Sequence, residues 1–283
     1  MNETTDTNDY SHRFHAGNVG DVFKHIVLLE LLRCVGGGTH RVHYIESHAG
    51  EGGYALDTTG EWTEGIGKLW ATSGYFVNDH TVSLYLEIVS SASRGARFYP
   101  GSPMVAAAVL GSEDRMTFWE KEPVTCGRLE KCFEKDTRVT VRRGDGIGAL
   151  TECVVGAKKN SGSVVVLIDP PYSTKSEWIT VPNMLVQAYA ASTDVCFVLW
   201  YPLKSLTRPN AMIARIRDAG VRATVVEWTN TPLELKRNRL NGSGLILVRP
   251  PRGCVSRILA GLPAVADVCA THDGRWSIRV VNF

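Results

Sequence analysis

The tetrapeptide Asp169-Pro170-Pro171-Tyr172 directly follows the apolar run VVVLI. In an open α/β sheet, ligands bind at the carboxyl ends of strands, so this tetrapeptide is expected to face a crevice. A Pro-Pro pair cannot continue a strand, because neither residue has a backbone N–H to donate, and it leaves a rigid turn with outward carbonyls. The sequence therefore predicts a shaped loop that presents acceptor groups at a strand end.

This loop suits the exocyclic amine of a nucleobase. The Asp169 carboxylate and the Pro170 carbonyl can each accept one N–H, and Tyr172 can stack on the ring. The lone pair of the adenine amine is delocalised into the ring, so two acceptors that draw the nitrogen toward tetrahedral geometry would let it attack a methyl donor. The alternative is a plain strand-ending turn in which Asp169 caps a helix near residues 175–177.

A glycine-rich segment at residues 46–53 follows another apolar run. Glycines such as Gly50 let a backbone approach a cofactor, although the spacing matches neither G-x-G-x-x-G nor a P-loop. Two further strand ends carry acids: Glu120 could hold ribose hydroxyls, and Asp145, which precedes Gly146, could accept from an adenine amino group. Together they predict an adenosine pocket, whereas each acid alone is more typical of a surface and the glycines alone of an ordinary turn.

Aromatic and ionisable side chains are dense in residues 10–25. Lys24 and His25 lie on a predicted helix whose other face is apolar, so they form a polar patch near its start. The segment either closes over a cofactor and substrate, or its His and Tyr side chains simply pack at the beginning of a helix.

Seven apolar, β-branched runs predict the strands that position these residues. They lie at residues 41–46, 115–120, 138–143, 163–169, 194–200, 222–228 and 243–249. Segments of helical spacing lie between most of them, which predicts a doubly wound, seven-stranded, mostly parallel α/β sheet. The seventh run is followed by Pro250-Pro251, which is typical of a strand that stops at a sheet edge.

One longer interval separates the first two predicted strands. We expect residues 57–98 to form a small helical insertion, with a helix at residues 83–92. Because no linker separates independent domains, residues 10–283 are expected to form a single domain, preceded by a disordered polar extension at residues 1–9.

The composition is that of an ordinary globular protein, with 283 residues, 44% hydrophobic and 21% charged. It excludes collagenous, disordered and disulfide-scaffold classes. The sequence shows no membrane-length apolar run and no secretory signal, so a cytoplasmic protein is expected. None of the seven cysteines forms a C-x-x-C pair, so they are interpreted as small core residues and no metal is expected.

Positive charge concentrates in the last third of the chain. Residues 201–283 hold 13 basic and 5 acidic residues, and 11 of the basic ones lie between Lys204 and Arg257. Such a block could attract a polyphosphate such as RNA. It could equally be a solvated surface without a partner.

Six motifs follow one another along the chain between about residue 10 and residue 250. They are Tyr10-x-His12-x-Phe14-His15-Ala16-Gly17-Asn18-x-x-Asp21-Val22-x-Lys24-His25, His48-Ala49-Gly50-x-Gly52, Tyr99-Pro100-Gly101-Ser102-Pro103, Asp145-Gly146, Asp169-Pro170-Pro171-Tyr172 and Leu199-Trp200-Tyr201-Pro202. In this order they resemble the bacterial 23S ribosomal RNA adenine-N6 methyltransferase family.

The resemblance implies a Rossmann-like fold, S-adenosylmethionine as methyl donor and 23S ribosomal RNA as partner. It places Asp169 at the catalytic position and also assigns Pro170 and Lys24 to catalysis. The implied cofactor-binding residues are Lys24, His25, His48, Gly50, Ser102, Glu120, Asp145 and Gly146, and the implied substrate-side residues are Tyr10, His12, Asn18 and Tyr172. Ser47 and Glu51 depart from the residues expected beside His48, and Glu51 adds a negative charge near the cofactor.

Three other functions are compatible with parts of this pattern. A DNA adenine-N6 methyltransferase would use the same tetrapeptide on a flipped base, but the chain shows no separate DNA-reading domain. A non-catalytic RNA-binding factor of ribosome assembly would need the basic block but not Asp169. A nicotinamide-dependent dehydrogenase is disfavoured because no G-x-G-x-x-G follows the first strand.

Overall fold

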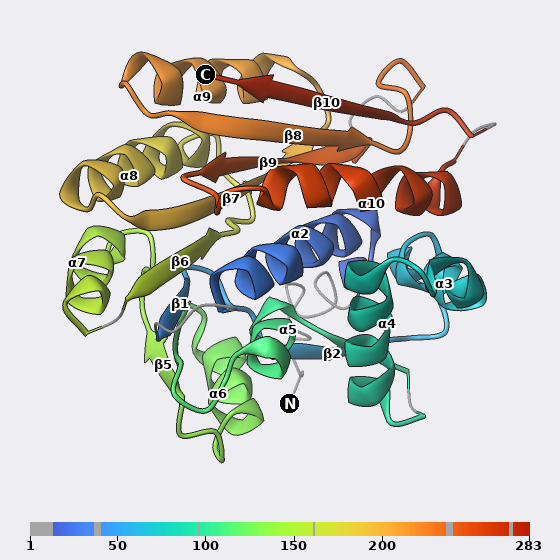
Figure 1. The fold of residues 1–283 in the computed structure, drawn as a ribbon, viewed down its shortest axis with the longest axis horizontal. Helices are drawn as coiled ribbons and strands as arrows, with labels where there is room; N and C mark the ends of the chain where they lie inside the picture. Colours follow the sequence, from blue (N-terminus) through green and yellow to red (C-terminus); the bar gives the residue numbers. More distant parts are fainter. Residues whose placement is uncertain (1–13, 37–40, 96, 161, 236–239, 272–273) are drawn as a thin grey trace, which may run out of the picture.

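The computed structural model describes residues 14–36, 41–95, 97–160, 162–235, 240–271 and 274–283. Its centre is an eight-stranded sheet with the order β10-β8-β9-β7-β6-β1-β4-β5 (Figure 1). The strands are β1 Val42–Glu46, β4 Arg115–Glu120, β5 Val139–Arg143, β6 Ser163–Ile168, β7 Val195–Leu203, β8 Ala223–Thr229, β9 Gly242–Val248 and β10 Ser277–Asn282. The polar extension predicted at residues 1–9 lies outside the described residues.

The seven predicted strands are all present, but the predicted count was wrong, because β10 adds an eighth. β10 pairs antiparallel with β8 at the edge of the sheet, and most of its side chains are exposed or half-buried. An edge strand of this kind lacks the continuous apolar run by which buried strands are recognised in a sequence. The predicted position of β9 at a sheet edge was also wrong. β9 lies between β7 and β8 and pairs antiparallel with both, so Pro250 follows an interior strand.

The central strands run parallel. β1 pairs with β4 and β6, β4 pairs with β5, and β6 pairs with β7, all in the parallel sense. Parallel strands buried on both faces are expected to be apolar along their whole length. β6 shows this, because every residue from Val164 to Ile168 is buried. The carboxyl ends of these strands therefore meet at one edge of the sheet.

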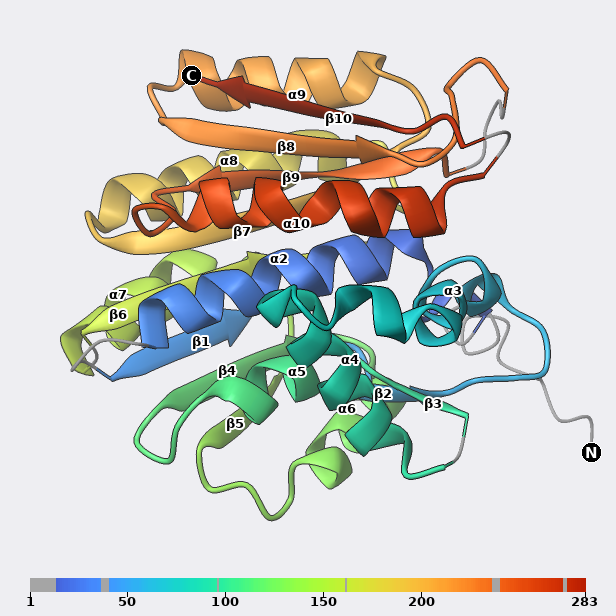
Figure 2. The same ribbon diagram turned by 45° about the vertical axis from the view of Figure 1, so that its right-hand side comes forward.

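Helices cover both faces of the sheet (Figures 1 and 2). One core includes apolar residues of α2, α4, α5 and α10, and the other includes those of α7, α8 and α9. The helices are α2 Val19–Gly36, α3 Ile66–Ala71, α4 His80–Ser93, α5 Ser102–Val109, α6 Pro123–Cys132, α7 Leu150–Asn160, α8 Glu177–Ala191, α9 Thr207–Asp218 and α10 Cys254–Cys269.

α2 is buried on nearly all sides, because it lies between the sheet and helices α4, α5 and α10 (Figure 2). Its apolar residues alone would predict such a position. Its buried residues also include Lys24, His25 and Glu30. Each of these polar groups needs a partner from another element, since an unpaired buried charge is costly.

Residues 57–98 contain the short 3₁₀ helices Glu61–Thr63 and Ser73–Phe76 together with α3 and α4. Strands β2 (Gly53–Ala55) and β3 (Phe98–Pro100) flank this segment and pair antiparallel with each other. α4 begins where Asp79 accepts hydrogen bonds from the backbone N–H groups of Thr81 and Val82. In the part of the chain that the structure describes, no helix has both the length and the apolar character needed to cross a membrane.

Candidate active site

A cavity of about 1610 Å³ opens at the edge where the parallel strands end. Most of the residues that the sequence assigns to the site line it: Asn18, Lys24, His25, His48, Gly50, Ser102, Glu120, Asp169, Pro170 and Tyr172. Asp145 and Gly146 are not part of its wall. Tyr10 and His12 lie outside the described residues, so the structure does not place them.

An ion-pair network joins α2 to the loop after β6. The Nζ atom of Lys24 lies 2.6 Å from Oδ2 of Asp169 and 2.8 Å from Oδ1 of Asp21. Burial disfavours the ammonium, but the two carboxylates outweigh it and raise the pKa of Lys24 well above its usual range. Lys24 is therefore a permanent cation beside Asp169.

Asp21 is a site residue that sequence reasoning did not assign. Its Oδ1 accepts from Lys24, and its Oδ2 accepts from the backbone N–H of Gly17 at 3.0 Å. Burial opposes ionisation, but Lys24 and the Gly17 hydrogen bond help to lower the pKa of Asp21. Its position three residues before Lys24 on one helix was the available signal.

His25 is a neutral, buried imidazole. Burial, reinforced by the nearby Lys24 charge, lowers its pKa to about 3. Nδ1 lies 2.8 Å from the hydroxyl of Tyr99, which in turn lies 2.9 Å from that of Tyr85. Nε2 is buried and has no hydrogen-bond partner among the described residues. A ligand in the cavity that His25 lines could supply the missing partner.

Glu46 ends β1 with no exposed surface, and neither carboxyl oxygen has a hydrogen-bond partner of good geometry among the described residues. Burial raises its pKa to about 8, against the opposing influence of Ser102 and Lys24. Glu46 is therefore mostly protonated at neutral pH. Sequence reasoning included it in the glycine-rich segment but gave it no role.

The loop after β1 and the end of β4 are held together through Glu120. Its Oε2 accepts the backbone N–H of Gly50 at 2.9 Å, and its Oε1 accepts that of Glu122 at 2.9 Å. Each carboxylate oxygen keeps a lone pair for a hydroxyl of a ligand. Gly50 has φ +62°, and a Cβ there would lie 2.2 Å from the hydroxyl of Tyr54, so this position requires glycine.

The loop after β5 packs on the loop after β1. A Cβ on Gly146 would lie 2.3 Å from the carbonyl oxygen of Ser47, which explains the glycine. Oδ1 of Asp145 accepts the backbone N–H groups of Ile147 and Gly148 at 3.1 and 3.2 Å, so this oxygen caps its own loop. The three predicted strand ends are adjacent, but Asp145 does not reach the wall of the main cavity.

The negative charge that Glu51 brings to the site is paired. Its Oε2 lies 3.1 Å from Nη1 of Arg128 on α6, and both residues line the cavity. Sequence reasoning missed Arg128, since nothing in the linear sequence links it to the glycine-rich loop.

Three aromatic side chains lie on the cavity wall beside Asp169. The ring of Tyr172 lies 4.3 Å from that of Trp178 and 6.5 Å from that of Trp200, measured between centroids. Tyr172 has φ +49°, which a residue with a side chain rarely adopts, so the Pro-Pro turn fixes an unusual direction for its ring. Trp178 is another residue that sequence reasoning missed.

The segment before α2 is attached to the region of residues 57–98. Nδ2 of Asn18 donates to Oε2 of Glu61 at 2.9 Å, and Nδ1 of His15 lies 2.9 Å from the same oxygen. The hydrogen bond with Glu61 raises the pKa of His15 despite its partial burial. All three residues line the cavity.

Four of the described basic residues between Lys204 and Arg257 have different surroundings. Lys204 and Arg208 line the cavity. Arg249 donates to a backbone carbonyl after α8 and lies over the ring of Tyr189, and Arg257 is paired with Glu30. The basic residues at positions 236, 237 and 239 lie outside the described residues. Only part of the predicted positive charge is thus shown to face the site.

The comparisons with known proteins identify the family. A family model described as "Ribosomal RNA large subunit methyltransferase D, RlmJ" matches residues 39–281. The chain belongs to this family. It is therefore a methyltransferase, with S-adenosylmethionine as its methyl donor. The resemblance seen in the sequence motifs is confirmed.

Two similar proteins are both named ribosomal RNA large subunit methyltransferase J. The one from Haemophilus influenzae is 29% identical over 283 residues, covering 96% of this chain and 98% of its own. The one from Escherichia coli is 30% identical over 250 residues, covering 86% and 87%. A crystal structure of a Legionella pneumophila protein is 28% identical, with a TM-score of 0.86 over 95% of this chain and 98% of its own. The predicted fold class is confirmed apart from the strand count.

The residues present in the cavity fit S-adenosylmethionine. Glu120 offers two positioned acceptors for the ribose hydroxyls. Gly50 has no side chain, so a ligand can approach the backbone next to Glu120. The buried Nε2 of His25 and Nε1 of Trp200 have no hydrogen-bond partner among the described residues, although both side chains line the cavity. Buried polar groups of this kind are normally satisfied, so a polar ligand is the expected partner.

Proposed function

We propose that the protein transfers the methyl group of S-adenosylmethionine to the N6 amine of an adenosine in 23S ribosomal RNA. Residues 10–283 would act as one methyltransferase domain with residues 57–98 as its insertion, working in the cytoplasm. The relatives named as ribosomal RNA large subunit methyltransferases support the RNA substrate. The choice of the adenine amine rests on the tetrapeptide that begins at Asp169.

The observation that carries this proposal is the position of Asp169. It follows β6 at the carboxyl edge, lines the cavity, and lies beside Pro170 and the aromatic group of Tyr172, Trp178 and Trp200. A carboxylate, a backbone carbonyl and flat aromatic surfaces are the groups that an adenine amine and its ring require. A turn with only a structural purpose would not need all three in one cavity.

The methyl donor would lie between the strand ends and α5. Glu120 would hold the ribose hydroxyls, and His48 and Gly50 would border the nucleoside. The first backbone N–H groups of α5, with Ser102 and Lys24, would attract the carboxylate of the methionine part, because a helix N-terminus and an ammonium both favour negative charge. When bound, S-adenosylmethionine supplies an electrophilic methyl group on a sulfonium.

Asp169 and Pro170 would activate the nucleophile. Accepting one N–H each, the carboxylate and the carbonyl draw the amine out of conjugation with the ring and expose its lone pair. As the methyl group is transferred, positive charge grows on the nitrogen, and the negative charge of Asp169 stabilises it. The methylated nitrogen then releases its extra proton to water. Tyr172 would hold the base by stacking on it.

Lys24 would position Asp169 before the substrate binds. In the structure its ammonium bridges Asp169 and Asp21. When the amine takes its place on Asp169, Lys24 still has Asp21 as a counter-charge, so no buried ammonium is left unpaired. Asp21 thereby lets Asp169 exchange partners at small electrostatic cost.

The test is methyl transfer by Asp169 variants. Protein-free large-subunit RNA from cells that lack this enzyme is incubated with labelled S-adenosylmethionine, digested to nucleosides and analysed for N6-methyladenosine by mass spectrometry. Asp169→Asn keeps the shape but loses the charge, so the rate should fall by about 10²–10³-fold. Asp169→Ala should cost at least as much.

Four controls make the result specific. S-adenosylmethionine binding should remain close to that of the unmodified protein in both Asp169 variants, and their melting temperatures should fall no further than that of Asp21→Asn, which also removes one of the two counter-charges of Lys24. Glu113→Gln, which removes an exposed carboxylate, should leave the rate unchanged. A DNA duplex containing adenine serves as a competing substrate. Activity within tenfold of the unmodified protein in Asp169→Ala, or methylation of the DNA in place of the RNA, would contradict the proposal.

A further inference from the structure

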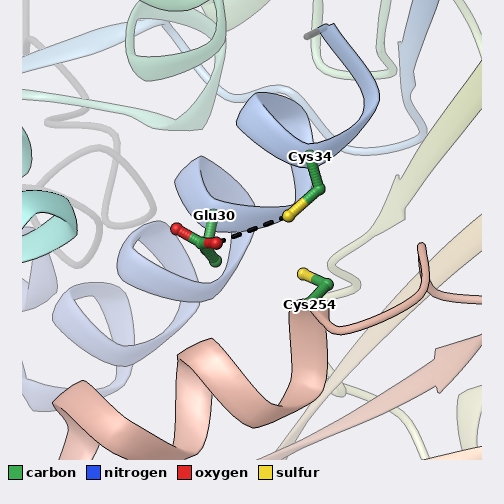
Figure 3. A group of neighbouring side chains, drawn as sticks. All are labelled: Glu30, Cys34 and Cys254. Carbon is green, nitrogen blue, oxygen red and sulfur yellow. Dashed lines mark hydrogen bonds between the residues drawn. The ribbon is translucent and has the colours of Figure 1, made fainter. Parts of the chain in front are cut away.

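A cluster of metal-binding side chains lies where α2 packs against α10. Glu30 and Cys34 come from α2, and Cys254 is the first residue of α10 (Figure 3). One potential ligand atom from each residue lies within 4.8 Å of the other two. None of the three lines the large cavity, so the cluster is separate from the proposed methyl-transfer site.

We propose that Glu30, Cys34 and Cys254 bind one thiophilic divalent cation of the zinc type. Thiolate and carboxylate are both common zinc ligands, and thiolates favour zinc over magnesium or calcium. The sequence indicated no metal, because that expectation rested on cysteine spacing along the chain. Here the ligands come from two helices that are far apart in the sequence.

The distance between Cys34 and Glu30 suits two ligands of a tetrahedral ion, and Cys254 lies within 4.8 Å of both. Zinc bonds to sulfur at about 2.3 Å and to oxygen at about 2.0 Å, which places a sulfur and an oxygen ligand about 3.5 Å apart. The Sγ atom of Cys34 lies 3.4 Å from Oε1 of Glu30. Cys254 has no exposed surface and Cys34 is half-buried, so the cluster is sheltered but accessible from one side. Water would occupy the remaining position.

Hydrogen bonds already orient the carboxylate of Glu30. Oε2 of Glu30 accepts from the hydroxyl of Thr81 at 2.6 Å and from Arg33 at 3.3 Å. Hydrogen bonds of this kind to the distal oxygen orient a ligating carboxylate and are typical of the surroundings of protein metal sites. The oxygen directed toward Cys34 is the other one, Oε1.

A cationic group already occupies the space between two of the ligands. Arg257 donates from Nε to Oε1 of Glu30 and from Nη2 to Sγ of Cys34. Its side chain is 56% exposed, so it can move aside without losing much packing. A divalent cation that displaces the two thiol protons leaves the total charge of the cluster unchanged. Arg257 then remains nearby as counter-charge for the two thiolates.

Cobalt and zinc titrations of the whole chain test the site. The protein is reduced, freed of metal with a chelator and titrated with Co²⁺, whose thiolate bonds give a charge-transfer absorption and whose visible bands report tetrahedral geometry. We expect saturation at one equivalent, displacement of Co²⁺ by Zn²⁺, and a melting temperature that rises with Zn²⁺ concentration. Cys34→Ser and Cys254→Ser should each abolish the charge-transfer band or weaken binding by at least tenfold.

Cys132→Ser is the matched control, because Cys132 is exposed on α6 and belongs to no such cluster among the described residues. It should bind Co²⁺ like the unmodified protein. Glu30→Gln should weaken binding, and the two serine variants keep the test valid if its buried position prevents folding. Absence of the band, or an unchanged band in both serine variants, would overturn the proposal. So would a Cys34–Cys254 disulfide that forms in air while the reduced protein takes up no metal.

Discussion

The buried carboxyl group of Glu46 gives a sharp test of the electrostatics of the cavity. It ends the central strand β1 without exposed surface and without a hydrogen-bond partner of good geometry among the described residues. Burial raises its pKa from 4.5 to about 8. The folded protein therefore binds a proton that the unfolded chain releases between these two values, so Glu46 lowers the free energy of unfolding increasingly as the pH rises.

The magnitude follows from the two pKa values. One pKa unit corresponds to about 1.4 kcal/mol, so the ionisable Glu46 should cost about 1 kcal/mol at pH 5, about 3 kcal/mol at pH 7 and about 5 kcal/mol at pH 9. Glu46→Gln has nearly the same shape as the protonated acid and cannot ionise. It should therefore match the unmodified protein near pH 4.5 and be more stable than it at pH 7 and above.

Urea unfolding followed by circular dichroism at pH 5, 7 and 9 measures the effect. The useful quantity is the difference between the two proteins at each pH, because all other titrating groups contribute equally to both. Glu113→Gln, at an exposed carboxylate, should show no such pH-dependent difference. If the difference between Glu46→Gln and the unmodified protein is the same at all three pH values, the reasoning about burial is refuted.

Three further changes test the rest of the site. Asp21→Asn removes one of the two counter-charges of Lys24 and should lower stability by about 1–3 kcal/mol at pH 7. Because the pKa of Asp21 is lowered in the fold, this loss should vanish in melting curves as the pH falls below its usual value of 3.8. Glu120→Ala should weaken S-adenosylmethionine binding, measured by calorimetry, by about 1–3 kcal/mol. It should also lower the melting temperature, because Glu120 accepts the backbone N–H groups of Gly50 and Glu122. The double change Lys204→Ala with Arg208→Ala should weaken RNA binding. It should also reduce the slope of the logarithm of the binding constant against the logarithm of salt concentration by the amount expected for about two phosphate contacts. Arg217→Ala, which removes an arginine paired with Asp218, should change neither quantity.

The central sheet could be predicted from the sequence because its strands are buried on both faces. A strand such as β6 is apolar at every position, and this pattern is visible without any tertiary information. β10 could not be recognised in the same way, since its side chains are mostly exposed and its pairing with β8 is what makes it a strand. The order of β9 and β8 in the sheet also depends on pairing, which no local pattern records.

The same distinction between local pattern and tertiary contact applies to the residues of the site. Residues at strand ends, such as Glu120 and Asp169, were found because the chain position of a strand end already implies a position in space. Arg128 and Trp178 were missed because they reach the cavity from helices whose sequences give no sign of it. Asp145 shows the limit of strand-end reasoning: its strand is adjacent to the others, but one of its oxygens caps its own loop.

The polar groups of α2 help to determine how this helix packs against the sheet. An apolar helix could pack against the sheet in several rotations and shifts with similar buried area. Lys24 near one end is paired with Asp169 of the loop after β6, and Glu30 nearer the other is paired with Arg257 of α10. Each charge also has a partner on α2 itself, Asp21 for Lys24 and Arg33 for Glu30, so a shifted helix would lose one ion pair at each of these positions without leaving a bare buried charge. The two pairs together therefore favour one rotation and one shift of α2, and the same contacts hold Lys24 against the carboxylate proposed to receive the target amine.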